Sequence, residues 1–146
     1  MALAALDFET TGRQPGADRI TQVAIVPFDG SQPFNRYVED DLEAVADWLH
    51  EWAAPKRLTL VAHNLPFDWA FMSCWLGRDR ADDLFVWPHR CTLQLALFCG
   101  CKRLSLGALC KQFGIALDRP HDALYDAYAC AELYRELNNR FLRKIL

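Results

Sequence analysis

The first third of the chain alternates between short apolar runs and polar turns, a pattern that predicts strands. Residues 3–8 are expected to form a buried strand, and after a polar loop with Gly and Pro the β-forming residues 20–28 predict a second one. Asp29-Gly30 is a hairpin turn signal, so residues 34–38 should return as a third strand. The chain therefore opens with a three-stranded meander.

Helical periodicity begins next. The acidic run Glu39-Asp40-Asp41 is expected to start a helix, because acids are favourable near the positive end of the helix dipole. Apolar residues then recur at helical spacing until Pro55 stops the pattern. Residues 58–62 form a short apolar run, and a strand that follows a helix implies a crossover and parallel pairing with the first strand.

The next helix carries an acid on its apolar face. Asn64 is expected to cap this helix, since asparagine is a favourable N-cap residue. Asp68 shares one face with three apolar residues at helical spacing, namely Phe71, Met72 and Trp75. That face should pack inward, so Asp68 is poorly placed for a charge that only serves solubility.

Three further helices complete the pattern. Two short ones are predicted at 92–98 and 105–113, each followed by a glycine suited to end a helix. The last is predicted at 122–142, and Asp126 borders its apolar stripe. Because there is no internal repeat, linker or low-complexity segment, we expect one α/β domain over residues 1–146.

Composition narrows the class of protein. A chain of 146 residues with 52% hydrophobic and 24% charged residues is typical of a folded globular domain. No apolar run approaches the ~20 residues that span a bilayer, and the N-terminus lacks the basic region of a signal peptide, so a cytoplasmic protein is expected. The six cysteines lack the spacing of a zinc site and are expected to be reduced, structural thiols.

A net charge of -3 argues against a protein that binds nucleic acid over a broad basic surface. It is compatible with an enzyme whose acidic site is neutralised by bound metal. Arg13, Lys102 and Arg103 are candidate phosphate contacts, although solvated surface charge is the simpler interpretation for each.

Candidate chemistry centres on Asp7 and Glu9, at the end of the first strand. Side chains two apart in a strand point the same way, so these carboxylates share a face. For this pair alone a solvated strand end is the ordinary interpretation. Asp68 and Asp126 change it, because four acids at buried edges of three elements predict a cage of oxygen ligands for Mg²⁺ or Mn²⁺. Two such ions about 3.5–4 Å apart stabilise both oxygens of a phosphoryl displacement.

His121 lies five residues before Asp126, just ahead of the last predicted helix. Histidine titrates near neutrality, so a histidine here is a candidate general base for the attacking water. Taken without the acids, a helix-capping or surface role would be the simpler interpretation.

Three motifs together resemble the signature of the DEDDh (DnaQ-like) 3′–5′ exonucleases, which include polymerase proofreading subunits, ribonuclease T and oligoribonuclease. In chain order, the motifs are Asp7-Phe8-Glu9-Thr10, His63-Asn64-x-x-Phe67-Asp68 and His121-x-x-x-x-Asp126. The resemblance runs from Leu3 to about Leu137. The resemblance implies an RNase H-like fold with a five-stranded mixed sheet flanked by helices. Its fifth strand should lie near residues 84–86.

The resemblance also implies roles for the acids and the histidine. Asp7, Glu9 and Asp126 would hold the ion that positions the nucleophilic water. Asp7 would bridge to a second ion, which Asp68 would support, and His121 would be the general base. Mg²⁺ or Mn²⁺, two ions per site, is therefore the expected cofactor.

Substrate contacts are implied for Thr10, Asn64 and the backbone near Phe8, which would face the terminal nucleotide. Phe8 and Phe67 would either contact its base or sugar or pack in the core. Family members usually carry a longer segment between the third strand and the first helix, and here Val38 passes almost directly into the acidic helix start. This shortening favours weak processivity or a partner that delivers the substrate.

The function expected from these features is a metal-dependent 3′–5′ exonuclease. It would hydrolyse phosphodiester bonds at the 3′ end of single-stranded nucleic acid, DNA favoured, and release nucleoside monophosphates. One alternative is a binding module of the same fold that docks on a polymerase or another nucleic-acid-processing protein. Another is an exonuclease that acts mainly on RNA, because discrimination rests on contacts to one 2′-hydroxyl.

Overall fold

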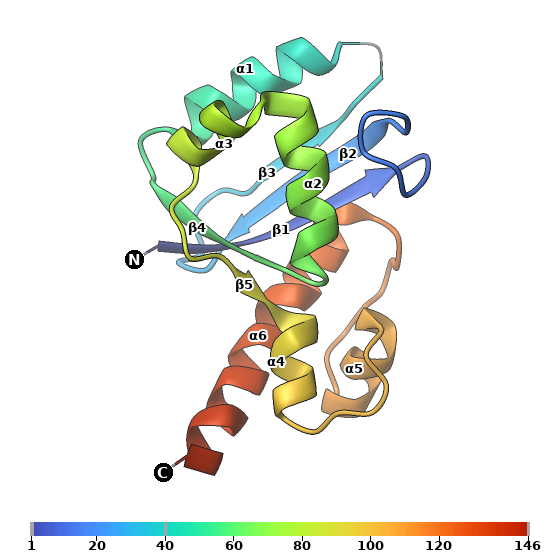
Figure 1. Cartoon of the computed structure of the whole chain (residues 1–146). Coiled ribbons are helices and arrows are strands. Elements are labelled where there is room, and N and C mark those ends of the chain that lie inside the picture. The colour runs from blue at the N-terminus through green and yellow to red at the C-terminus, as the bar shows by residue number, and fades with distance from the viewer. Residues whose placement is uncertain (1, 40, 146) are drawn as a thin grey trace.

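The computed structural model describes residues 2–39 and 41–145 and contains a mixed sheet with helices on both faces (Figure 1). In the order β3-β2-β1-β4-β5, the sheet comprises β1 (Ala2–Thr10), β2 (Ile20–Pro27), β3 (Phe34–Tyr37), β4 (Leu58–Ala62) and β5 (Arg90–Cys91). The first three strands are antiparallel, whereas β4 and β5 are parallel to β1 and β4 respectively. The predicted meander, and the predicted parallel pairing of residues 58–62 with the first strand, are confirmed.

Three helices cover one face of the sheet and one long helix crosses the other (Figure 1). The covering helices are α1 (Leu42–Ala53), α2 (Leu65–Leu76) and α3 (Arg78–Leu84). The long helix is α6 (Ala123–Ile145), which extends beyond the sheet. There it packs against α4 (Thr92–Phe98) and α5 (Leu106–Phe113), so the molecule has a second, smaller hydrophobic cluster.

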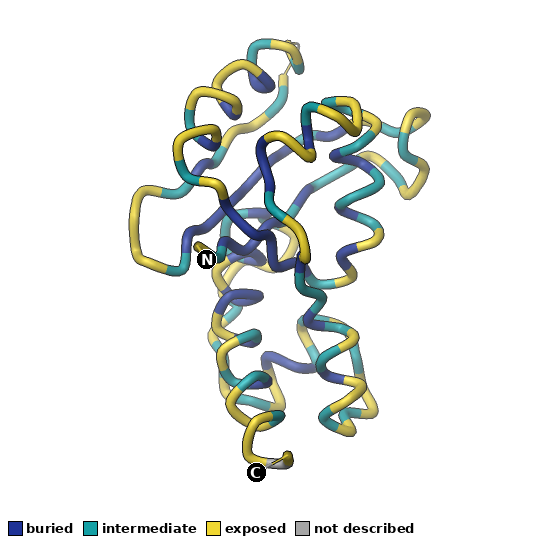
Figure 2. Tube along the Cα trace, turned by 60° about the vertical axis from the view of Figure 1, so that its left-hand side comes forward, coloured by how far each residue is buried: buried dark blue, intermediate teal, exposed yellow. Residues whose placement is uncertain are grey.

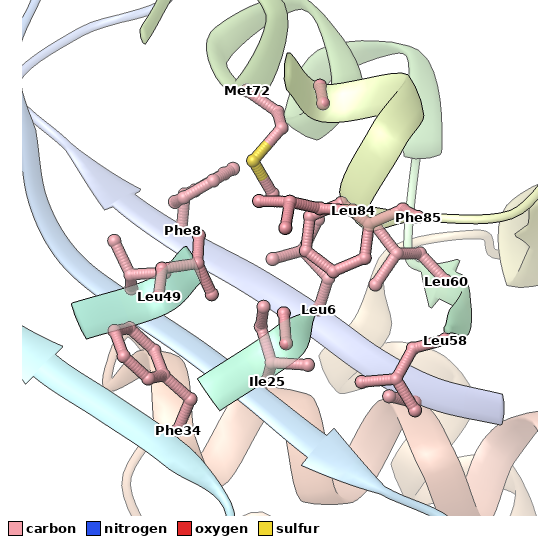
Figure 3. Packing of buried hydrophobic residues seen from close by; sticks show 14 of the residues in the cluster. Leu6, Phe8, Ile25, Phe34, Leu49, Leu58, Leu60, Met72, Leu84 and Phe85 are labelled. Atoms are coloured by element: carbon pink, nitrogen blue, oxygen red, sulfur yellow. The ribbon is translucent and has the colours of Figure 1, made fainter. Parts of the chain in front are cut away.

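The main core lies between the sheet and helices α1 to α3 (Figure 3). Leu6 and Phe8 of β1 point into it, whereas Ala5 belongs to the cluster on the opposite face. This alternation is the period-two pattern of a strand, and it leaves Asp7 and Glu9 on the same face as Ala5. Along the trace, burial is concentrated in the strands and in the inner sides of the helices (Figure 2).

The α6 face of the sheet is built from small side chains. Its buried cluster includes five alanines, which are Ala5, Ala24, Ala123, Ala127 and Ala131. Because alanine keeps backbones close, α6 can lie near β1 without bulky side chains between them. This close approach places Asp126, in the first turn of α6, next to the β1 carboxylates.

The helix ends agree in part with the predictions. Asp41 caps α1 by accepting a hydrogen bond from the Ala44 amide at 2.9 Å, while Asp40 of the same acidic run lies outside the described residues. Ser105 caps α5, and the glycine after that helix has the left-handed φ of 67° that suits a helix end. The last helix ends at Ile145, three residues beyond its predicted end at residue 142.

One prediction is wrong and another holds only in part. The fifth strand does not lie at residues 84–86: α3 ends at Leu84, Phe85 makes one isolated bridge to Leu58, and the strand that completes the sheet is β5. Helix α3 was not predicted, because its sequence is mostly charged and only Ala81 and Leu84 are buried. Asn64 is the N-cap residue of α2, as predicted, but its side chain makes no capping hydrogen bond; it adopts a left-handed φ of 64°, which asparagine tolerates better than most residues.

The six cysteines are free thiols, as expected, and two of them, Cys110 and Cys130, are buried. Over residues 2–39 and 41–145, no helix combines the length and the apolar character needed to cross a membrane.

Candidate active site

The predicted carboxylates come together where β1 ends and where α2 and α6 begin. Asp7 and Glu9 belong to β1, and Asp68 and Asp126 lie in the first turns of α2 and α6. A helix N-terminus carries a partial positive charge, which favours a carboxylate in the first turn. Asp68 is only 3% exposed and Asp126 only 9%. The elements therefore force two buried acids toward the acidic end of a core strand.

The pKa of Asp7 is raised by burial and because the other carboxylates lie close to it. Burial raises the pKa well above its usual range, and the charges of four surrounding carboxylates raise it further, in the order Asp68, Asp126, Glu9 and Asp122. Each of the three predicted partners of Asp7 thus acts on it directly. The prediction that these acids share one site is consistent with this electrostatic coupling.

The pKa of Asp68 is also strongly perturbed. Burial raises its pKa to about 8, although backbone amides of Asp68 and Phe8 stabilise the carboxylate and partly offset the effect. Glu9 adds repulsion. Without a counter-charge, burying Asp68 in its ionised form is therefore costly.

Glu9, His121 and Asp126 form the tightest group of metal-ligating side chains among the described residues. Their carboxylate oxygens and ring nitrogen all lie within 4.8 Å of one another. Oδ2 of Asp126 accepts a hydrogen bond from the His121 amide at 3.2 Å, whereas Oδ1 is buried and has no hydrogen-bond partner. Burial and Asp126 raise the pKa of Glu9, while His121 lowers it.

These residues fit a hard divalent cation. A buried carboxylate oxygen without a partner is a rare and costly arrangement, and coordination to a cation would satisfy it. The same charge would relieve the repulsion that raises the pKa of Asp7. The donors are carboxylates and one imidazole and include no thiolate, a set that suits Mg²⁺ or Mn²⁺.

Local backbone features shape the strand end and the histidine. The pairing of β1 with β2 is irregular between Glu9 and Thr10, because Glu9 lies opposite Gln22 but Thr10 lies opposite Ile20. The Thr10 hydroxyl donates to the Gly12 carbonyl at 2.7 Å and so begins the β1–β2 loop. His121 has a left-handed φ of 66° and lies two residues before the start of α6.

The structure also identifies residues that the sequence did not single out. Gln22, on β2, donates to Oδ1 of Asp122 at 3.1 Å and accepts from the Ala123 amide at 2.9 Å. Asp122 in turn accepts from the Tyr37 hydroxyl at 3.1 Å. Asp122 is the first residue of the last predicted helix and could have been recognised as a cap, but nothing local indicates Gln22 or Tyr37 as its partners.

The remaining motif residues have varied surroundings. Phe8 is 5% exposed and packs edge to face against Trp75, which matches the core-packing alternative for its side chain. Phe67 is partly buried and lies 4.9 Å from the Phe71 ring, centroid to centroid, while Asn64 is exposed.

His63 connects the end of β4 to α4 and to the segment before α5 through its two ring nitrogens. Burial lowers the pKa of its ring. The two nitrogens lie 2.8 Å from the Thr92 hydroxyl and 2.7 Å from the Leu104 carbonyl. Arg13, Lys102 and Arg103 are all exposed at the surface.

A cavity of about 390 Å³ lies beside the short connection between β3 and α1. Its lining is mixed: Ile20, Val38, Phe71 and Trp75 are apolar, whereas Asp18, Arg19 and Glu39 are charged. Only residues 38–41 separate the two elements, in agreement with the shortened segment noted in the sequence.

A mixed sheet flanked by helices, with carboxylates from three elements gathered at one strand end, defines the class of metal-dependent nucleases with an RNase H-like fold. Comparison with known proteins agrees with this class. The RNase_T family model, described as an exonuclease, matches residues 38–134. The chain therefore belongs to the exonuclease family, within its DEDDh (DnaQ-like) type, whose members are metal-dependent hydrolases of phosphodiester bonds.

Among curated relatives, the PolC-type DNA polymerase III of Oceanobacillus iheyensis is 30% identical over 169 residues, covering 94% of this chain and 11% of the polymerase. The corresponding polymerase of Streptococcus thermophilus is 42% identical over 80 residues, covering 53% of this chain and 5% of its own length. The chain thus spans only a small part of these polymerases.

Two solved structures share the fold. Exonuclease I of E. coli, in complex with a dA16 oligonucleotide, aligns with a TM-score of 0.74 and 18% identity over 97% of this chain and 42% of its own. Brucella melitensis NrnC aligns with a TM-score of 0.75 and 20% identity over 97% of this chain and 74% of its own. NrnC has also been solved with bound Mg²⁺.

Proposed function

We propose that this chain is a metal-dependent 3′–5′ exonuclease that removes nucleoside monophosphates from single-stranded nucleic acid, with DNA favoured. One observation carries the proposal: Glu9, His121 and Asp126 lie within 4.8 Å of one another, next to the strongly perturbed Asp7. A module that only binds would have no need to assemble mutually repelling carboxylates around a histidine. Family membership supports the same reaction.

The metal ligands in this proposal are Asp7, Glu9, Asp68 and Asp126. Asp7, Glu9 and Asp126 would hold one Mg²⁺ or Mn²⁺ ion, and Asp68 would support a second one together with Asp7. When bound, the two ions supply Lewis-acid stabilisation for the charge that develops on the attacking and leaving oxygens. The free Oδ1 of Asp126 supports its assignment as a ligand.

His121 is the proposed general base. Its ring lies close to the carboxylates of Glu9 and Asp126, is exposed, and so can accept a proton from the attacking water and pass it to solvent. Glu9 and Asp126 stabilise the imidazolium that results, because their negative charges lie within a few ångströms of the ring.

The terminal nucleotide is proposed to lie between Thr10, Asn64 and Phe67, which border the acidic site on β1 and α2. Phe67 is partly exposed and offers a ring face for the base or sugar. The cavity lined by Phe71 and Trp75 lies further along α2, and Val38 of the short β3–α1 connection also lines it. Because only residues 38–41 connect β3 to α1, little chain is available there to hold the strand, and weak processivity is expected.

DNA is favoured because the matched curated relatives are DNA polymerases. They also support a polymerase as the partner that delivers the 3′ end.

The test is a degradation assay on DNA and RNA strands of matched sequence, each labelled once at the 5′ end and once at the 3′ end. With Mg²⁺, the 5′-labelled strand should shorten one nucleotide at a time, and the 3′-labelled strand should release labelled mononucleotide at once. Faster shortening of DNA is expected. A DNA strand with a phosphorothioate at its last linkage is the matched control, since it should resist the first cut.

Release of the 5′ label as a mononucleotide, or cleavage inside the strand, would contradict the proposed polarity. Faster shortening of RNA would favour the RNA enzyme. If the folded protein bound Mg²⁺ yet cleaved no strand, the catalytic proposal would fail and a docking module would replace it.

A further inference from the structure

Gln22 is a polar side chain buried within the sheet. It lies on β2, is 3% exposed, and is the cross-strand neighbour of Glu9. A buried amide must find partners for both its oxygen and its nitrogen, or else it destabilises the fold. Where these partners lie therefore tells what the residue holds in place.

Most of the partners of Gln22 lie about a hundred residues away, at the start of α6. Its Oε1 accepts a hydrogen bond from the Ala123 amide at 2.9 Å, and its Nε2 donates to Oδ1 of Asp122 at 3.1 Å. Nε2 also donates to Oδ1 of Asn35 on β3 at 3.0 Å. The amide is thus fully engaged and joins two strands to the first residues of the helix.

Tyr37 adds a second attachment from the edge of the sheet. Its hydroxyl donates to Oδ2 of Asp122 at 3.1 Å, so the two oxygens of that carboxylate are held from β2 and β3 respectively. Oδ1 also accepts from the Leu124 amide at 3.1 Å. We call Gln22, Tyr37 and Asp122 the α6 clamp.

His121 directly precedes the α6 clamp. Its side chain is exposed, so its position depends on its backbone more than on packing. The backbone has a φ of 66°, a conformation that non-glycine residues rarely adopt unless neighbouring contacts impose it. Such contacts come from the α6 clamp, which fixes the backbone at Asp122 and Ala123, directly after His121. A further contact is the hydrogen bond from the His121 amide to Asp126.

We propose that Gln22, assisted by Tyr37, is a positioning residue that holds the imidazole of His121 in place for proton transfer. The inference rests on the proposed role of His121 as general base. It adds that this role depends on a buried amide that does not touch the substrate. Loss of the clamp would leave the base present but displaced, and displacement of about 1 Å can reduce a rate on the order of 10²-fold.

The experiment is a double-mutant cycle on the hydrolysis of the p-nitrophenyl ester of thymidine 5′-phosphate with Mg²⁺, which separates kcat from KM on one small substrate. The variants are Gln22→Met, of similar shape without the amide, and His121→Ala, each alone and combined. Gln94→Met is the matched control because Gln94 is exposed on α4. Tyr37→Phe removes one hydroxyl from a residue that is 61% exposed, so it keeps the test open if Gln22→Met does not fold.

Gln22→Met should lower kcat by about 10- to 100-fold with KM changed by less than about twofold. In the His121→Ala background the same substitution should change kcat by less than about twofold, because the base is already absent. Tyr37→Phe should give a smaller loss of kcat that also disappears in that background. Gln94→Met should have no effect.

An equal loss of kcat in both backgrounds would overturn the inference, since Gln22 would then act on the fold in general. A rise in KM without loss of kcat would also overturn it. If His121→Ala alone turned over at a near-normal rate, the base assignment itself would fall, and that failure is visible without any clamp variant.

Discussion

Replacing Asp68 with asparagine should stabilise the metal-free protein. Asp68 is 3% exposed and burial raises its pKa to about 8, whereas an aspartate in an unfolded chain titrates near 3.9. The unfolded chain therefore loses this proton first, and the wild type loses stability as the pH rises from about 4 to about 8. An asparagine side chain does not titrate, so the Asp68→Asn variant escapes this loss.

Below the folded pKa of about 8, the difference between the pH and the unfolded pKa of about 3.9 sets the magnitude. At pH 7 the folded protein retains a proton on Asp68, whereas the unfolded chain has lost it about three pH units lower. Deprotonation therefore favours the unfolded chain by about 4 kcal/mol at most. At pH 5 the same reasoning gives about 1.5 kcal/mol. Asparagine preserves shape and can still accept from the Phe8 amide, so the gain should not be offset by lost packing.

The assay is urea unfolding at pH 5 and pH 7 in the presence of a chelator, followed by the same measurement with Mg²⁺. Asp68→Asn should unfold at higher urea than the wild type at pH 7, and the gap should shrink at pH 5. Mg²⁺ should stabilise the wild type by about 2.7 kcal/mol at a concentration 100 times its Kd, and it should stabilise the variant less. Asp83→Asn, which alters an exposed acid of α3, is the control and should change stability by about 0.5 kcal/mol or less.

A variant Asp68→Asn that was less stable than the wild type at pH 7 without metal would refute this reasoning. A gap of equal size at both pH values would refute it as well, since the gain would then come from something other than proton binding.

Three further variants test separate parts of the proposed site and fold. Asp7→Ala should abolish Mg²⁺-dependent turnover while leaving the fold intact, because it removes an acid from a site where carboxylates repel; circular dichroism and the cleavage assay check this, and retained activity would contradict the ligand assignment. His121→Ala should lower kcat by roughly 10²–10⁴-fold, as expected for a lost general base, and a near-wild-type kcat would instead indicate a capping role. Burial lowers the pKa of His89 to about 4, so this histidine is protonated in the unfolded chain before it is protonated in the folded one, and the protein should lose about 2 kcal/mol of stability between pH 7 and pH 5. The His89→Asn variant should lack this acid sensitivity in urea unfolding. An unchanged pH dependence in that variant would exclude His89 as its source.

The site residues whose direction follows from the periodicity of a single strand or helix could be predicted from the sequence. Asp7 and Glu9 are two residues apart in a strand, and Asp68 shares the apolar face of its helix, so their directions follow from the geometry of single elements. Asp126 lies beside the apolar stripe of α6 and is buried for the same reason. The resemblance to a known family then indicated that these directions converge.

Features that depend on contacts between distant segments could not be predicted this way. Gln22 looks like a polar position in an alternating strand, and only its partners at Asp122 and Ala123 reveal why it is buried. Local patterns also misplaced the fifth strand, because the apolar residues after the charged α3 resemble a strand. Phe85 makes only one bridge to the start of β4, and the paired strand is formed further along, by Arg90 and Cys91 beside Val61 and Ala62.

The most direct test of the central claim is the rate at which a 5′-labelled single-stranded DNA is shortened as a function of Mg²⁺ concentration, for the wild type and for Asp7→Asn. We predict single-nucleotide shortening that is absent in chelator, rises with Mg²⁺, and is lost in the variant at every Mg²⁺ concentration although the variant folds. Shortening that persists in chelator, or that Asp7→Asn carries out at the wild-type rate, would contradict the claim that these carboxylates form a metal-dependent catalytic site.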